Sequence, residues 1–172
     1  MSTIGVSIAV PEPCGARLQD YRVALGDEPA RGIPTHVTLL PPFELDDSHL
    51  AEVDGHLGEA ARSAEPFRVH LRGTGTFRPV SPVVFVVVVE GISACEQLAG
   101  RIRTGPLSVQ PRFPYHPHVT VAHELDDTLL DKAFVDLADF DCVFRADRFH
   151  LYVHEGEAGW RPVRSFELGA GG

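Results

Sequence analysis

The stretch FPYHPHVTVA, residues 113–122, has a near copy earlier in the chain, THVTLLP at residues 35–41. Each copy contains a His-x-Thr triplet that continues into aliphatic residues, and each has a proline within two residues before the histidine. A β-strand places residues i and i+2 on the same face. Each triplet therefore presents one imidazole and one hydroxyl on one face, while the valine between them points into the core. Two such strands facing across a groove would form an acid/base site for a phosphate ester.

The apolar pattern predicts the same order of elements around both copies. Each half contains a helix, a proline-containing loop, the His-x-Thr strand, a helix that begins at an Asp-Asp pair, and then paired strands. We expect the first His-x-Thr strand to end at the two prolines after it. The predicted strands cover residues 3–10, 35–40, 67–77, 83–89, 118–123, 142–145, 149–153 and 161–168, and the predicted helices cover residues 14–25, 46–63, 92–103 and 126–138.

The repeated order predicts an internal duplication with a groove between the halves. We expect an α+β fold in which antiparallel sheets line the groove and helices cover the outer faces. A length of 172 residues suits one domain. We therefore predict one domain over residues 1–172, with two intertwined lobes at about 1–90 and 91–168.

Composition limits the function classes. The net charge of −9 argues against broad binding to nucleic acid or to anionic membranes, but it leaves room for a small anionic ligand. The longest apolar run, residues 83–89, is far shorter than the roughly 20 residues of a membrane helix. The three cysteines are widely spaced and form no CxxC pair, so we expect reduced, unremarkable thiols and a cytoplasmic protein. We expect no membrane association and no obligate protein partner.

The two motifs resemble those of the 2H phosphoesterase superfamily, which includes 2′-5′ RNA ligase-like proteins and 2′,3′-cyclic nucleotide phosphodiesterases. The resemblance covers roughly residues 3–168 and implies a bilobal fold with pseudo-twofold symmetry and one motif from each lobe at a central cleft. It implies that His36 and His118 are the acid/base pair and that Thr38 and Thr120 bind the phosphate oxygens. It also implies that the protein uses no metal and no cofactor.

The chemistry of these residues agrees with the resemblance. Opening a cyclic phosphodiester needs a base that deprotonates water and an acid that protonates the leaving alkoxide, and histidine can do either near neutral pH. Threonine hydroxyls can donate hydrogen bonds to phosphate oxygens without adding charge. The symmetric pair does not reveal which histidine is the base.

The residues before the second motif depart from the family pattern. Members often carry a basic residue at that place, whereas this chain has His116 and a proline there. Arg78 and Arg112 are the candidates to balance the phosphate charge. Phe43, Phe113 and Tyr115 are the candidates to stack on a base.

The sequence thus favours a metal-independent phosphodiesterase that opens the cyclic phosphate of a small nucleotide or an RNA end. One alternative is a 2′-5′ RNA ligase or 2′-5′ phosphodiesterase that uses the same residues. A second is a binding module that holds phosphorylated ligands without turnover. A third is a metal hydrolase, because His116, His118 and His123 lie close together in the sequence.

Overall fold

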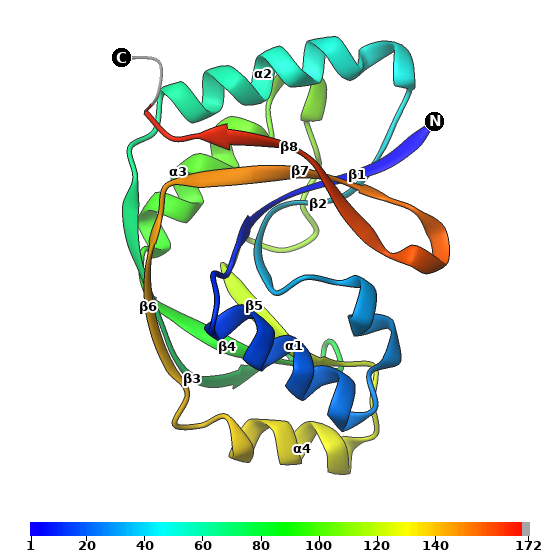
Figure 1. Ribbon diagram of the computed structural model, residues 1–172, viewed down its shortest axis with the longest axis vertical. Helices are drawn as coiled ribbons and strands as arrows, with labels where there is room; N and C mark the ends of the chain where they lie inside the picture. Colours follow the sequence, from blue (N-terminus) through cyan, green and yellow to red (C-terminus); the bar gives the residue numbers. More distant parts are fainter. Residues whose placement is uncertain (170–172) are drawn as a thin grey trace.

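The computed structural model describes residues 1–169, which form two four-stranded antiparallel sheets and four α-helices (Figure 1). The strands are β1 (Ser2–Ala9), β2 (His36–Leu45), β3 (Phe67–Thr76), β4 (Val83–Glu90), β5 (His118–His123), β6 (Asp141–Ala146), β7 (Arg148–His154) and β8 (Trp160–Glu167). The helices are α1 (Cys14–Leu25), α2 (Leu50–Arg62), α3 (Ile92–Ile102) and α4 (Asp127–Asp136). The predicted α+β class is confirmed.

The two sheets place the His-x-Thr strands at equivalent positions. Sheet A has the order β2-β1-β7-β8, and sheet B has the order β5-β4-β3-β6. The motif strands β2 and β5 are therefore edge strands, and they contact each other between the two sheets. This arrangement brings two segments about eighty residues apart in the sequence to one central cleft.

Two helices pack against the sheet that does not contain the strand before them, and we call them crossing helices. Helix α1 follows β1 of sheet A but packs against β5, and α3 follows β4 of sheet B but packs against β2. Figure 1 shows α1 and α4 beside sheet B, and α2 and α3 beside sheet A. We call sheet A with α2 and α3 lobe A, and sheet B with α1 and α4 lobe B. The crossing helices make the lobes intertwined.

The predicted lobe ranges, 1–90 and 91–168, do not follow the sheets. Strands β3 and β4 belong to sheet B, whereas β7 and β8 return to sheet A beside β1. An apolar pattern indicates which face of a strand is buried but not which strand is its neighbour. The range of each lobe was therefore beyond what the pattern could specify.

Strand register supports the duplication. In lobe A, Thr38 on β2 lies opposite Ser7 on β1. In lobe B, Thr120 on β5 lies opposite Phe85 on β4. Both pairs of strands are antiparallel, so Ser7 and Phe85 occupy equivalent positions beside the two threonines.

Alternating burial orients the motif strands as predicted. In both strands the histidine and threonine are partly exposed, and the residues that follow each of them are completely buried. Each buried Val or Leu stabilises the fold by roughly 1.5–3 kcal/mol. The buried anchors are Val37, Leu39, Val119 and Val121.

Strand β2 does not end at its two prolines, which corrects the sequence prediction. It continues through Pro41 and Pro42 to Leu45, and both prolines are exposed. Proline cannot donate to a ladder, but an edge strand needs donors on one side only. The register between β1 and β2 also shifts between Ile4 and Val6, opposite the prolines. This irregularity accommodates the missing donors.

Two of the three cysteines form a disulfide, so the expectation of unremarkable thiols was wrong for this pair. Cys14 begins α1 and Cys142 lies on β6, the edge strand of sheet B, with Cα atoms 6.6 Å apart. They are 128 residues apart in sequence and meet only because α1 crosses to lobe B. Cys95 is buried and unpaired. Within residues 1–169, the structure has no helix of the length and apolarity needed to span a membrane.

Replacing both disulfide cysteines by serine should lower the free energy of unfolding by about 2–4 kcal/mol, because the bond restricts the unfolded chain. Denaturant unfolding without reductant would measure this loss. Reductant should destabilise the parent by a similar amount and leave the Cys14→Ser/Cys142→Ser variant unchanged. Equal stability of the parent with and without reductant would contradict the prediction.

Candidate active site

One cavity of about 390 Å³ lies between the lobes. The four motif side chains all line it: His36 and Thr38 from lobe A, and His118 and Thr120 from lobe B. The strands therefore bring together the imidazoles and hydroxyls that the sequence singled out. Two imidazoles and two neutral hydroxyls around one cavity can transfer protons to and from a bound phosphate ester.

Backbone carbonyls fix the tautomer of both imidazoles in the same way. Nδ1 of His36 lies 2.6 Å from the Pro34 carbonyl oxygen, and Nδ1 of His118 lies 2.7 Å from the His116 carbonyl oxygen. A carbonyl oxygen can only accept, so each Nδ1 carries the proton and donates it. Nε2 is then the nitrogen that exchanges protons with a ligand in both motifs.

Burial lowers the pKa of both imidazoles below the ordinary value of 6.5. The carbonyl hydrogen bonds oppose this effect, because they favour the charged ring. The Arg22 cation also lowers the pKa of His36, and the neighbouring His116 and His36 lower that of His118. The neutral form of each ring is therefore favoured in the free protein.

The cavity has a cationic residue that the sequence analysis missed, Arg22 on α1. Its side chain is buried, and its Nε and Nη2 donate to one carboxylate oxygen of Asp27 at 3.1 and 2.7 Å. Arg22 shares the buried face of α1 with Leu18 and Leu25. In the sequence, the only sign of this role is that Arg22 falls between two leucines on the apolar face of the helix. The sequence does not show that α1 packs against lobe B, which is what brings Arg22 to the cavity.

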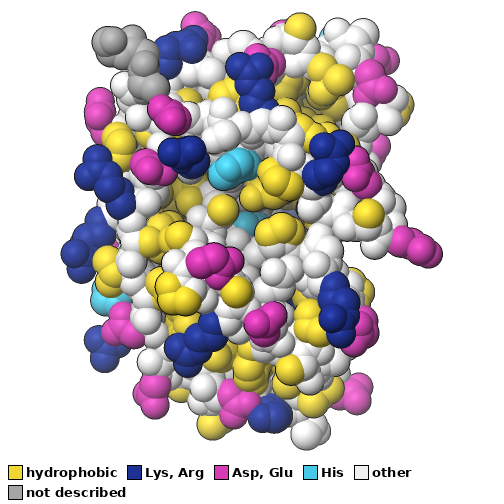
Figure 2. Space-filling view, in the orientation of Figure 1, with side chains coloured by type: hydrophobic (Ala, Val, Ile, Leu, Met, Phe, Trp, Pro, Cys, Tyr) yellow, Lys and Arg dark blue, Asp and Glu magenta, His cyan; other side chains and the backbone are white. Residues whose placement is uncertain are grey.

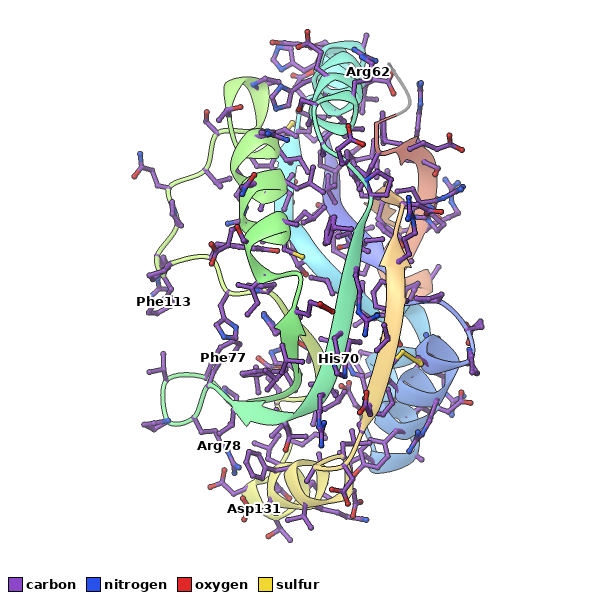
Figure 3. All side chains as sticks on the ribbon, turned by 90° about the vertical axis from the view of Figure 1, so that its left-hand side faces the viewer. Arg62, His70, Phe77, Arg78, Phe113 and Asp131 are labelled. Carbon is purple, nitrogen blue, oxygen red and sulfur yellow. A yellow bond between two sulfur atoms is a disulfide. The ribbon has the colours of Figure 1, made fainter. Side chains whose placement is uncertain are left out.

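Arg78 and Arg112 lie outside the cavity wall. Arg78 Nη1 is 2.9 Å from Asp131 and 3.5 Å from Asp127, and these contacts hold its side chain beside α4 and away from the cavity. Figure 3 shows Arg78 directed toward α4, where Asp131 lies. Arg112 is exposed and packs over the ring of Phe113. Arg22 thus replaces both arginines as the candidate for the phosphate charge.

Phe43 and Tyr115 support β2 and are not part of the cavity wall. Phe43 packs against the core and pairs with β1. The Tyr115 hydroxyl donates to the Thr38 carbonyl at 2.7 Å, and the Arg103 guanidinium lies over the Tyr115 ring. Arg103 also donates to the Leu39 carbonyl at 2.7 Å. These contacts join the loop before β5 to the backbone of β2, so Tyr115 positions the first motif.

An aromatic cluster surrounds the second motif. The rings of Phe77 and Phe85 lie 4.9 and 5.3 Å from the ring of His118, and both also contact His116. His118 and His123 line the cavity, whereas His116 packs on the phenylalanines. In the part of the chain that the structure describes, no three His, Cys, Asp or Glu side chains gather as metal ligands.

The surface around the lobes carries mixed charge. On the face shown in Figure 2, hydrophobic side chains gather near the centre, and acidic and basic side chains are interspersed around them. Such a face lacks the single-sign stripe typical of long nucleic-acid contacts.

Comparisons with known proteins identify the family of this chain. The family model of the 2′-5′ RNA ligase superfamily matches residues 10–158. A Bacillus pumilus protein named "Putative phosphoesterase" is 34% identical over 142 residues, covering 81% of this chain and 82% of the relative. A Bacillus licheniformis protein of the same description is 31% identical over 140 residues, covering 80% and 82%.

Solved structures show the same fold. E. coli LigT complexed with NADP+ superimposes with a TM-score of 0.72 at 17% identity and 97% coverage of both chains. A Thermus thermophilus protein, TT0787, gives 0.65 at 23% identity, with 96% of this chain and 97% of that chain covered. Because the family model spans most of the chain and both of its His-x-Thr motifs line one cavity, the protein belongs to the 2′-5′ RNA ligase superfamily of 2H phosphoesterases.

Proposed function

We propose that this phosphoesterase hydrolyses the 2′,3′-cyclic phosphate of a small nucleotide or an RNA end, using only groups of its own chain. The observation that carries the proposal is the pair of imidazoles, each with Nδ1 held by a carbonyl, that share one cavity with two threonine hydroxyls. This arrangement supplies an acid, a base and neutral donors to one phosphate.

In the proposed reaction, His36 is the base and His118 is the acid. Neutral His36 Nε2 takes a proton from water as the water oxygen attacks phosphorus. The bond from phosphorus to one ribose oxygen breaks, and protonated His118 gives its proton to that oxygen. We assign the base role to His36 because Arg22, a permanent cation, favours its neutral form. Thr38, Thr120 and Arg22 would stabilise the negative charge that grows on the phosphoryl oxygens.

The ligand class follows from size and charge. The cavity volume lies in the range of small-molecule sites, and the net charge of −9 disfavours long RNA. Structures of E. coli LigT are described as complexes with 3′-AMP, with ATP and with phosphate. We transfer from these descriptions only the expectation of a small nucleotide ligand.

Replacing either catalytic histidine by alanine should lower turnover of 2′,3′-cyclic AMP by roughly 10²–10⁴, the range for losing a positioned acid or base. The double variant should lose less than the product of the two effects, because the pair acts as a unit. Assays in EDTA, with phosphorus NMR to identify the product, would measure both effects. His49→Ala, an exposed histidine outside the cavity, is the matched control.

Four results would redirect the assignment. Full activity of the folded double variant would remove the acid/base role. Activity lost in EDTA and restored by one metal would favour a metal hydrolase. Turnover restricted to 2′-5′-linked dinucleotides, or nucleotide binding without any turnover, would favour the other two alternatives.

Replacing a motif threonine by valine removes a hydroxyl with little change in shape. Thr38→Val and Thr120→Val should each lower kcat/KM by about 10- to 150-fold, because a hydrogen bond to a charged group is worth roughly 1.5–3 kcal/mol. Ser165→Ala on the exposed part of β8 is the control. Unchanged kcat/KM in both valine variants would remove the threonines from the phosphate site.

The pH dependence of kcat/KM tests the assigned roles. The base must be neutral and the acid protonated, and both pKa values lie below 6.5, so the maximum of the bell should lie below pH 6.5. Arg22→Met combined with Asp27→Asn avoids leaving a buried carboxylate unpaired. Without the cation the pKa of His36 rises, so the acidic limb should move to higher pH while the alkaline limb stays.

Arg22→Lys retains the positive charge and is the matched control, in which the acidic limb should stay near its original pH. If only the alkaline side of the pH profile of kcat/KM moves in the Arg22→Met/Asp27→Asn variant, His36 is the acid and His118 is the base. No movement of either limb would show that Arg22 does not influence the reacting groups.

A further inference from the structure

The cavity continues past the catalytic side chains along sheet A. Ser7 lies opposite Thr38, and Gly5, two residues before Ser7 on β1, lies opposite Tyr152 on β7. All four residues line the cavity. Two residues along a strand span about 7 Å. The wall at Gly5 and Tyr152 therefore begins about 7 Å from the row that would hold the phosphate.

Trp160 continues this wall at the start of β8. A Cβ atom on Gly5 would lie 3.3 Å from Cζ3 and 3.7 Å from Cη2 of the indole, so the ring rests directly on the backbone of β1. The other side of the hairpin supports the ring through His154, whose centroid is 5.0 Å away. Trp160 is only partly buried. Because Trp160 also lines the cavity, its indole can stack on a base held there.

Two hydroxyl-bearing side chains line this part of the cavity. Ser7 and Tyr152 are each 7% exposed, so most of their surface is covered by the protein. Burial raises the pKa of Tyr152, so its hydroxyl remains a donor. A hydroxyl can both donate and accept, so these two cavity-lining side chains can hydrogen-bond a polar ligand such as a ribose.

The lobe B wall of the cavity is built from different side chains. Phe85 occupies the position equivalent to Ser7, and its ring packs against Phe77 with centroids 4.5 Å apart. Both rings also pack against His118. Val83, two residues before Phe85 on β4, lines the cavity at the position equivalent to Gly5. Lobe B therefore offers an aliphatic side chain where lobe A offers the indole that rests on Gly5.

From this asymmetry we propose that lobe A holds a nucleoside subsite, in which Trp160 stacks on the base and Ser7 and Tyr152 face the ribose. The substrate class is then a nucleoside 2′,3′-cyclic phosphate with one nucleoside on the lobe A side of the phosphate. This inference rests on the proposed function, because that function places the phosphate between the histidines.

Binding can be tested without turnover, since Trp160 is the only tryptophan in the chain. Titration of the parent protein with 2′-AMP and with 3′-AMP should change its fluorescence in a saturable way. Ribose phosphate and inorganic phosphate, which lack a base, should cause little change. Equal fluorescence changes with ribose phosphate and with the nucleotides would overturn the stacking role.

Kinetic measurements with a substrate that lacks the base provide a second test of stacking on Trp160. The parent should prefer 2′,3′-cyclic AMP over 1-O-methylribose 2,3-cyclic phosphate by about 5- to 150-fold in kcat/KM, the range expected for one stacked base. Trp160→Ala should remove most of this preference by slowing only the nucleotide, whereas Trp160→Phe should keep part of it. Gly5→Ala should lower the preference by less than Trp160→Ala does, because the added methyl group would lie 3.3 Å from the indole and shift the ring only slightly.

Phe113→Ala, an exposed aromatic outside the cavity, is the control and should keep the full preference. An equal loss on both substrates in Trp160→Ala would overturn the subsite and leave the proposed function intact. If the parent hydrolyses neither substrate, the proposed function fails, and the fluorescence titration still decides whether a base stacks on Trp160.

Discussion

Both His-x-Thr motifs depend on the antiparallel pairing of an edge strand with a single neighbour. Strand β2 is held by β1 and β5 is held by β4, and each has its other edge turned toward the cleft between the sheets. Exposed edges tend to pair with other chains. Here the crossing helices α1 and α3 pack against β5 and β2. The same crossing brings Arg22 to the cavity, so protection of the edges and completion of the site have one structural cause.

The parts of the fold that depend on local pattern could be predicted from the sequence. Alternation around His36 and His118 indicated which residues face the cleft, and the repeated order of elements indicated the duplication. The assignment of strands to sheets could not be predicted, because β7 returns to β1 across more than a hundred residues. The Cys14–Cys142 bond was hidden for the same reason.

The candidate site was predicted only where its residues carry a motif. Arg22, Ser7 and Trp160 belong to no motif, and each reaches the cavity through long-range packing. Arg78 carried the expected charge, but its partner Asp131 lies on a helix more than fifty residues away. A charged side chain in a sequence does not show whether a neighbour already balances its charge.

The disulfide divides the site covalently. A bond between Cys14 and Cys142 closes a ring of chain that contains both histidines and both threonines of the motifs. Ser7, Tyr152 and Trp160 lie on the two chain segments outside that ring. The proposed catalytic residues thus lie within the covalently closed part of the chain. The residues proposed to bind the nucleoside lie in the N-terminal and C-terminal segments outside it, and these two segments pair in sheet A. Sequence changes in these two segments can alter substrate choice while the covalent ring that carries the catalytic groups stays the same.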